Sequence, residues 1–222
     1  MKLKPMTKTK IQIYKPFGSS ISQQDLPLEL IKDFKDDLDM IMKLPEDKKK
    51  GYRFGHKLAG GLGDGEFLIT PEVMLKWKRQ YFDEVITFYA ESHFNDRKVE
   101  RIIINSAWHN RMLKNQWNPI HTHSTYIGPQ ENPSISTVGY IEVPKQMNPI
   151  EGEKLHYPFS GCVEWREGSE GMFQHASYKR LPKERQFFVF PANTQHFVYP
   201  HSADKPRISF SFNAVIKFQK LN

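Results

Sequence analysis

Residues 185–218 read RQFFVFPANTQHFVYPHSADKPRISFSFNAVIKF, and this stretch decides the fold class. Three runs rich in aromatic and β-branched residues are separated by Pro, Asn and Asp turn signals, and they cover residues 185–191, 196–200 and 207–218. In the last run Arg207 and Ser209 alternate with Ile208 and Phe210, which predicts a strand with one polar and one apolar face. Successive short strands of this kind indicate a sandwich or barrel.

The chain upstream supplies more strands and two helices. Further strand patterns cover residues 11–18, 100–113, 133–144 and 161–168. Leu30, Phe34, Leu38 and Ile41 are spaced by three and four residues, as in an amphipathic helix.

A second helix is expected after Thr70, an N-cap residue followed by a proline at the first helical position. Its apolar residues predict a broad face that needs a sheet to cover: Val73, Leu75, Trp77, Tyr81, Val85, Phe88 and Tyr89. We therefore expect a mainly β fold with flanking helices (α+β).

The length of 222 residues predicts one domain, with helical support over about 20–95 and a β core over about 99–219. Hydrophobic residues make up 38% and aromatics 13%, which excludes a disordered chain. No long apolar stretch follows the N-terminus, so we expect no membrane partner and a cytoplasmic location. The net charge of +7 mixes signs along the chain, so nucleic-acid binding is only weakly indicated.

Two features are interpreted as structural. The single cysteine, Cys162, excludes a disulfide framework and a multi-cysteine metal site, and we expect it to pack in a strand. The glycine-dense run 58–67 lacks both a P-loop lysine and the dinucleotide-binding glycine order. We interpret it as a flexible loop that could cover a site.

Chemistry is indicated by three of the nine histidines. His121 and His123 stand one residue apart in NPIHTHST, so on an extended chain the two imidazoles share a face. His196 opens a strand after a Phe-Pro turn, and Arg207 and Ser209 follow on one face of the last strand. Three imidazoles suit a metal ion, and an arginine beside a hydroxyl suits a carboxylate ligand.

SAWHNRMLKNQWNPIHTHS (106–124), SISTVGYIEVP (134–144) and FPANTQHFVYP with RISFSFN (190–213) resemble the iron(II) and 2-oxoglutarate-dependent oxygenases. They look closest to the oxygenases of marine cyanophages, whose pattern is W-x-N, N-x-x-H-x-H and S-x-x-Y-x-x-x-P. The resemblance implies a double-stranded β-helix, or jelly-roll, core.

Carried over residue by residue, the resemblance implies a metal role for His121 and His196. It implies that Arg207 and Ser209 bind the distal carboxylate of 2-oxoglutarate, and that Asn110 touches this cosubstrate. Tyr140 and Trp165 could line the cavity, although strand aromatics are more often core residues.

His123 is the departure, because most of the superfamily has a carboxylate there. Either His123 is the third ligand of a neutral triad, or it stands behind the ligands and an acid or water completes the site. The nearest acid downstream is Glu131. We favour His123 as a ligand, since its spacing from His121 needs no rearrangement.

The function expected from these residues is that of a dioxygenase, using iron(II), 2-oxoglutarate and dioxygen to hydroxylate a substrate with release of succinate and carbon dioxide. Two alternatives stay open: a three-histidine zinc hydrolase or hydratase, and a non-catalytic jelly-roll that binds a ligand. The sequence leaves the substrate open among a protein side chain, a nucleobase and a small metabolite.

Overall fold

A computed structural model describes residues 11–55, 65–94, 96–123, 133–145, 159–168 and 176–220. The helical elements are α1 (Leu28–Lys43), α2 (Glu46–Lys49), the 3-10 turn η1 (Lys50–Tyr52), α3 (Pro71–Trp77), the π-helix η3 (Lys78–Phe82) and α4 (Asp83–Glu91). The strands are β1 (Gln12–Phe17), β2 (Ser19–Asp25), β3 (Glu66–Leu68), β4 (Val99–Met112), β5 (Asn118–His121), β6 (Ile135–Glu142), β7 (Val163–Arg166), β8 (Ser177–Arg180), β9 (Gln186–Pro191), β10 (Gln195–Val198) and β11 (Arg207–Phe218).

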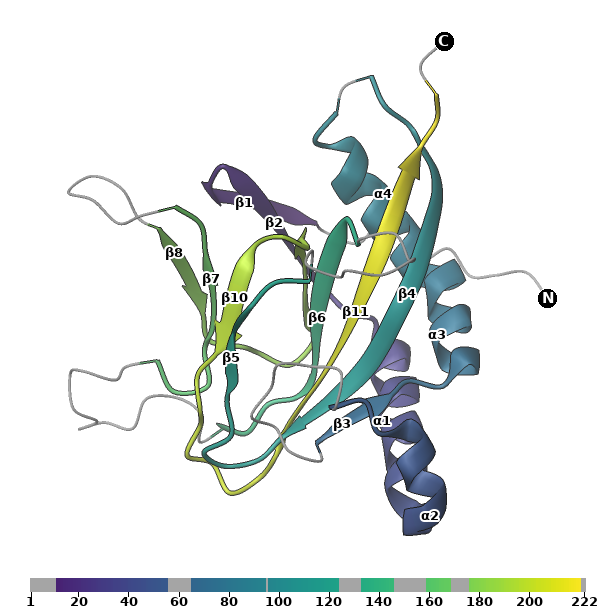
Figure 1. Ribbon diagram of the computed structural model, residues 1–222, viewed down its shortest axis with the longest axis vertical. Coiled ribbons are helices and arrows are strands. Elements are labelled where there is room, and N and C mark those ends of the chain that lie inside the picture. Colours follow the sequence, from purple (N-terminus) through teal and green to yellow (C-terminus); the bar gives the residue numbers. More distant parts are fainter. Residues whose placement is uncertain are drawn as a thin grey trace.

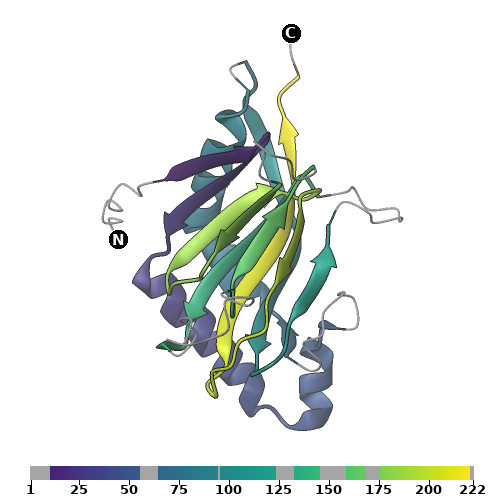
Figure 2. The same cartoon turned by 90° about the vertical axis from the view of Figure 1, so that its left-hand side faces the viewer.

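Two antiparallel sheets face one another. The major sheet has seven strands in the order β1-β2-β9-β6-β11-β4-β3, and the minor sheet has four in the order β5-β10-β7-β8. In Figure 1 the helices α1, α3 and α4 cover one side of the major sheet, and the minor sheet lies on its other side. Figure 2 shows the same arrangement with the minor sheet toward the viewer. The fold is a double-stranded β-helix with flanking helices, as the sequence predicted.

Strand β11 lies at the centre of the major sheet, between β4 and β6. Its register with β4 runs from Arg207 opposite Met112 to Phe218 opposite Val99. Because side chains alternate, the polar residues of β11 face the minor sheet and the apolar ones face the helices. One strand therefore supplies a wall of the space between the sheets and the centre of the core beneath the helices.

The helix-facing side of the major sheet is an aromatic core. Phe210 lies with its ring centroid 4.4 Å from that of Phe34 on α1. Phe212 lies 4.8 Å from Phe82. Gly139 on β6 makes room for Phe210, since a Cβ at this glycine would lie 2.3 Å from the Phe210 ring. The dense packing fixes α1 and the α3–α4 helices on the sheet.

A buried polar contact also joins helix and sheet. His109 on β4 and Asp37 on α1 lie 2.9 Å apart, and both side chains are almost fully buried. The Thr70 hydroxyl also donates to the Asp37 carboxylate at 2.6 Å. Burial by itself raises the pKa of Asp37, but the hydrogen bonds from His109 and Thr70 outweigh it and hold this pKa below its ordinary value. Either side chain alone would be a buried polar group without a hydrogen-bond partner. The contact therefore favours the one position of α1 on the sheet in which Asp37 and His109 meet.

All seven strand predictions are confirmed. The patterns at 11–18, 100–113, 133–144, 161–168, 185–191, 196–200 and 207–218 correspond to β1, β4, β6, β7, β9, β10 and β11. Four further strands had no expected counterpart: β2, β3, β5 and β8. Part of β3 falls at the end of the glycine-dense run, so residues 66–67 are strand and not loop, whereas residues 58–64 lie outside the described ranges.

The helix predictions are confirmed in position and partly wrong in detail. On α1, Leu30, Phe34, Leu38 and Ile41 are all buried as expected. The second helical segment is interrupted by the π-helix η3, whose wider turn changes which side chains face the sheet.

Leu75 and Phe88 were expected on the covered face, yet 52% and 51% of their surfaces are exposed, while Phe82 and Ile86 are buried. Thr70 stands at the N-cap position, but its hydroxyl bonds Asp37 and makes no cap. Within the described ranges, no helix has the length and apolar character needed to span a membrane.

Candidate metal centre and adjoining pocket

The structure brings His121, His123 and His196 together. His121 is the last residue of β5, and its Cα pairs with that of His196 on β10. Their ring centroids lie 4.2 Å apart. His123 follows β5, with its ring centroid 5.0 Å from His121 and 5.1 Å from His196. One nitrogen from each ring lies within 4.8 Å of the others, a spacing that suits a shared metal ion.

Hydrogen bonds orient two of these rings. The Nδ1 atom of His121 lies 2.7 Å from the Pro119 carbonyl oxygen, and Nδ1 of His196 lies 2.9 Å from that of Thr194. A carbonyl oxygen accepts only, so each Nδ1 carries a proton and donates it. The Nε2 atom of each ring is left with a free lone pair. Both side chains thus present the nitrogen that can bind a metal.

The environment of the three rings keeps them uncharged. Burial lowers the pKa of His121, and burial with the neighbouring His121 ring lowers the pKa of His123 to about 3. The pKa of His196 is lowered for the same reasons, with both neighbouring rings contributing. Neutral imidazole is the form that ligates metals. Near neutral pH the three rings are therefore already uncharged, and no imidazolium has to lose a proton before a metal binds.

No carboxylate joins the cluster among the described residues. Glu131, the acid considered as an alternative ligand, lies outside the described ranges. Three neutral nitrogens fit a divalent ion of the iron or zinc type and leave further coordination positions for other ligands.

Arg207 lies behind the histidines in the wall formed by β11. Its side chain is buried, and Nη1 donates to the Gly161 carbonyl at 3.2 Å. Nε has no hydrogen-bond partner in the described ranges. The guanidinium carbon lies 5.6 Å from the centroid of the Tyr140 ring. Within the described part of the chain no carboxylate pairs with Arg207, and burial lowers the pKa of its guanidinium. The site therefore contains a buried cation with donor capacity to spare.

A pocket joins this arginine to the histidine cluster. Seven residues of its lining are polar side chains from the strands: Asn110, Asn118, Tyr140, His196, Arg207, Ser209 and Ser211. The indole of Trp108 donates to the Asn110 side-chain oxygen at 3.1 Å, and the Asn110 amide donates to the Ser211 hydroxyl at 3.3 Å. The predicted residues Asn110, Arg207 and Ser209 thus line one space together with His196.

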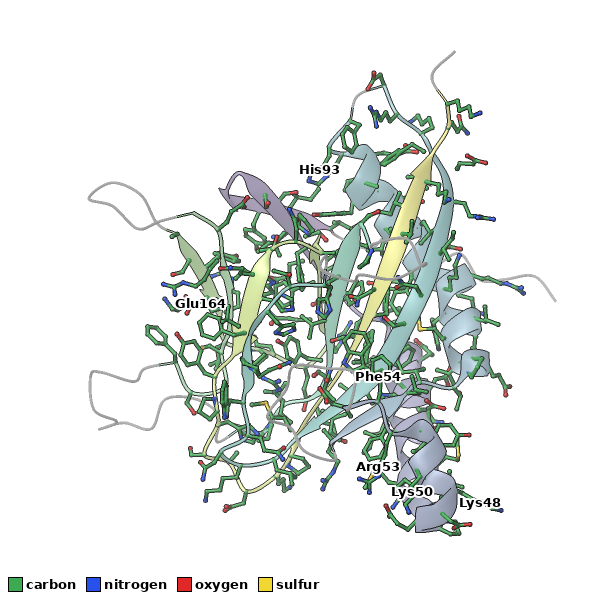
Figure 3. All side chains as sticks on the ribbon, in the orientation of Figure 1. Lys48, Lys50, Arg53, Phe54, His93 and Glu164 are labelled. Atoms are coloured by element: carbon green, nitrogen blue, oxygen red, sulfur yellow. The ribbon has the colours of Figure 1, made fainter. Side chains whose placement is uncertain are left out.

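Tyr140 and Trp165 belong to the same buried cluster, but of the two only Tyr140 lines the pocket. Tyr140 lines the pocket, and its buried hydroxyl has no partner. Trp165 instead packs among Phe188, Phe190 and Tyr178 between the two sheets. Its neighbour Glu164, labelled in Figure 3, belongs to the minor sheet and bonds the Tyr199 hydroxyl at 2.7 Å.

Three residues of this region were not singled out from the sequence. Phe54, labelled in Figure 3, packs at 5.3 Å against Trp108, whose ring lies 5.9 Å from His123. Glu66 pairs in register with Asn110 and is buried, and burial raises its pKa to about 7. Asn213 lies 3.2 Å from His123. For Glu66 and Asn213 the only sequence signal is alternation along a strand, which does not distinguish them from core residues. Phe54 lies outside the strands and has no such signal.

The other described histidines have structural contacts. His93, labelled in Figure 3, bonds the Tyr89 carbonyl at 2.7 Å, and His201 bonds the Met112 carbonyl at 3.1 Å. His109 points to Asp37 and not into the pocket. Cys162 is buried directly before β7, and burial raises the pKa of its thiol to about 11, as suits a packing residue.

Comparison with known proteins gives a family for the same region. Residues 106–213 match the family described as "Putative 2OG-Fe(II) oxygenase". No curated protein sequence matches the chain.

Solved structures of similar fold include a prolyl-4-hydroxylase of Pseudomonas putida, at 15% identity and a TM-score of 0.56 over 89% of this chain and 92% of that one. The viral collagen prolyl hydroxylase of Paramecium Bursaria Chlorella virus-1, solved with 2-oxoglutarate, is 12% identical with a TM-score of 0.54 over 87% and 94%. HygX of Streptomyces hygroscopicus, solved with nickel and 2-oxoglutarate, is 10% identical with a TM-score of 0.52 over 93% and 83%.

Every site residue predicted from the sequence falls within residues 106–213, the segment that matches the 2OG-Fe(II) oxygenase family. The protein is accordingly an oxidoreductase, with iron(II) as its cofactor and 2-oxoglutarate as its cosubstrate.

Proposed function

We propose that the protein is a dioxygenase that hydroxylates a protein or small-molecule substrate. In this proposal His121, His123 and His196 hold iron(II). Arg207 and Ser209 bind the distal carboxylate of 2-oxoglutarate, and Asn110 contacts the same cosubstrate. When bound, iron(II) and 2-oxoglutarate supply an oxidation by dioxygen that releases succinate and carbon dioxide.

The observation that carries the proposal is the buried guanidinium of Arg207, which no carboxylate of the described residues neutralises, in the pocket that His196 also lines. A buried cation without a counter-ion costs several kcal/mol, roughly. A carboxylate ligand would remove this cost by ion pairing and by accepting from the unpartnered Nε. The geometry therefore favours a ligand that carries an anionic end at Arg207 and metal-binding oxygens near the histidines.

The chain's own groups have separate tasks. The Pro119 and Thr194 carbonyls hold two imidazoles with Nε2 directed away from them. Tyr140 places an unpartnered hydroxyl in the wall beside Arg207, where it can donate to a bound carboxylate. Trp108, which lines the pocket, holds Asn110 by its indole N–H, and Phe54 packs against the Trp108 ring.

Two solved structures of similar fold are described as prolyl hydroxylases. With the three-histidine cluster and the arginine pocket, they support hydroxylation as the outcome of the reaction. The substrate class is left as a protein side chain or a small molecule, with a nucleobase less favoured.

Metal analysis and cosubstrate turnover test the proposal. Protein purified without oxygen, loaded with iron(II) and then exposed to oxygen should release succinate from 2-oxoglutarate at one equivalent per carbon dioxide. His121→Ala should abolish both iron retention and turnover, whereas His93→Ala, outside the pocket, should preserve both. Zinc retention without succinate release would instead favour the hydrolase alternative, and retention of neither metal would favour a binding protein.

Three broader assignments are also proposals. The chain is proposed to be most similar to marine cyanophage oxygenases, supported by its N-x-x-H-x-H stretch at 118–123, and a comparison with phage genomes tests this. It is proposed to act in a cytoplasm, that of a host cell if it is phage-encoded, which cell fractionation tests. Residues 1–222 are proposed to form one domain, which predicts a single cooperative unfolding transition.

A further inference from the structure

The three imidazoles of the cluster differ in what holds their Nδ1 atoms. For His121 and His196 the partner is the main-chain carbonyl two residues earlier, at Pro119 and Thr194. Neither carbonyl can donate, so both rings are fixed as the tautomer with a proton on Nδ1. The main chain therefore prepares two of the three rings to ligate through Nε2.

The third ring has a side-chain partner. Nδ1 of His123 lies 3.2 Å from Nδ2 of Asn213 on β11, and the main-chain N–H of His123 donates to the Ala192 carbonyl at 2.8 Å. Asn213 is only 7% exposed, and its Oδ1 is buried with no hydrogen-bond partner among the residues that the structure describes. The Asn213 amide thus directs its donor, Nδ2, at the His123 ring, while its acceptor, Oδ1, forms no hydrogen bond with the described residues.

The amide orientation decides the tautomer. With Nδ2 opposite the ring, Nδ1 of His123 accepts, so the proton is on Nε2 and the lone pair that a metal needs is absent there. Turning the amide by half a rotation exchanges Nδ2 for Oδ1 with little change in shape. Nδ1–H then donates to Oδ1, and Nε2 becomes free to ligate, as in the other two rings.

The surroundings of Asn213 accommodate either orientation. Its register partners on β4 and β6 are Ser106 and Ser136, so hydroxyl-bearing residues flank it on both sides in the sheet. A hydroxyl can donate or accept, unlike a carbonyl or an amide N–H. The neighbouring hydroxyls therefore do not favour one orientation of the Asn213 amide over the other.

We propose that Asn213 is a positioning residue that selects the ligating tautomer of His123. Its Oδ1 accepts from Nδ1–H when a metal ion occupies the cluster, and its Nδ2 donates to Nδ1 when the cluster is empty. The inference rests on the proposed function, because it takes His123 as the third ligand. The proposal explains how His123, whose Nδ1 has no main-chain acceptor, can adopt the same tautomer as His121 and His196.

Two substitutions separate this role from simple packing. Asn213→Leu preserves the size of the side chain and removes the acceptor, so Co(II) affinity, measured by visible absorption, should fall by about 10- to 100-fold. Asn213→Asp keeps an acceptor and should bind Co(II) at least as tightly as the unsubstituted protein. Asn105→Leu, at an exposed position of β4, is the matched control and should leave the affinity unchanged.

A second measurement reads the tautomer directly. In protein labelled with ¹⁵N at histidine, the His123 ring, assigned with His123→Gln, should have its proton on Nε2 without metal and on Nδ1 with Zn(II). Persistence of the Nε2 proton in the Zn(II)-loaded protein would overturn the inference, and so would wild-type Co(II) affinity in Asn213→Leu.

The outcomes distinguish the two proposals. If the unsubstituted protein binds iron(II) and releases succinate while Asn213→Leu binds Co(II) normally, only the role of Asn213 is lost. If the unsubstituted protein binds neither Co(II) nor iron(II), the proposed function fails and the inference falls with it. Should Asn213→Leu not fold, Asn213→Asp and the ¹⁵N measurement on the unsubstituted protein still decide.

Discussion

The two faces of β11 are equally buried and opposite in character. Toward the helices, Phe210 and Phe212 have no exposed surface, and on the other side Arg207 and Ser209 are 3% and 1% exposed. The apolar face is surrounded by rings that fill the space around it. The polar face has atoms for which the described part of the chain supplies no hydrogen-bond partner, among them Nε of Arg207 and Oδ1 of Asn213.

The difference shows that burial has separate consequences on the two sides of one sheet. Apolar burial stabilises the chain by removing surface from water and by close packing. Polar burial stabilises only when each group finds a partner, and otherwise it costs free energy. The helix-facing side should therefore control folding, whereas the side facing the minor sheet should control ligand binding.

Phe210→Ala tests the apolar side and should have the largest effect. It removes a ring packed against Phe34, Phe82 and Phe187, and the free energy of unfolding should fall by about 4 kcal/mol. Urea denaturation measures this. Phe88→Ala, at a ring that is 51% exposed, should change stability by less than about 1 kcal/mol. Equal losses of unfolding free energy in the two variants would show that packing on the helix-facing side of β11 does not control stability.

Glu66→Gln tests the cost of polar burial beside the pocket. Burial raises the pKa of Glu66 to about 7, above its ordinary value of 4.5. The folded chain therefore holds a proton that the unfolded chain releases, so stability is full below pH 4.5 and is lost as pH rises through 7. Glutamine does not ionise, so the free energy of unfolding of the variant should not fall in this way. Relative to the unsubstituted protein, the variant should therefore be more stable at pH 8 than at pH 4 by about 3 kcal/mol.

Urea denaturation at the two pH values measures the gain. Glu100→Gln, at an exposed position of β4, should show no such pH-dependent difference. A difference at Glu66 that does not change with pH would show that its carboxyl ionises normally in the folded protein.

Arg207→Met tests the polar side through its ligand. Loss of the guanidinium should weaken binding of 2-oxoglutarate by about 100-fold, while the free energy of unfolding stays the same or rises because a buried cation is removed. Calorimetric titration and urea denaturation measure the two quantities. Arg101→Met, at an exposed position of β4, should alter neither. A large loss of stability without loss of affinity would mean that Arg207 is a structural residue.

The sequence predicts long elements better than short ones. Strand β11 was expected at residues 207–218 and lies there, because twelve residues of alternation outweigh any competing pattern. Strands β3, β5 and β8 have three or four residues each, too few to show a period, and β5 contains Pro119. The π-helix η3 changes the phase of its helix by a local hydrogen-bond shift, which a fixed period of 3.6 cannot anticipate.

In the candidate site, too, the residues with a distinctive sequence pattern were predicted and those with an ordinary pattern were missed. His121, His123 and His196 were singled out because imidazoles at this spacing are uncommon, and the structure brings their donor atoms together. Glu66 and Asn213 were missed because an acid or an amide in a strand has many ordinary roles. Only the register that sets Glu66 beside Asn110, and the contact of Asn213 with His123, reveals their position.

The long ladder between β4 and β11 has a consequence for motion, although its register shifts after Asn213 and after Lys217. Its pairing extends over almost the whole of both strands, from Arg207 and Met112 to Phe218 and Val99. Central ladders open only when a domain unfolds globally, so their amides exchange with solvent deuterium most slowly. The wall that bears Arg207 and Asn213 should thus stay closed on the timescale of turnover, and breathing that admits or releases small molecules should arise in the short strands β5 and β10.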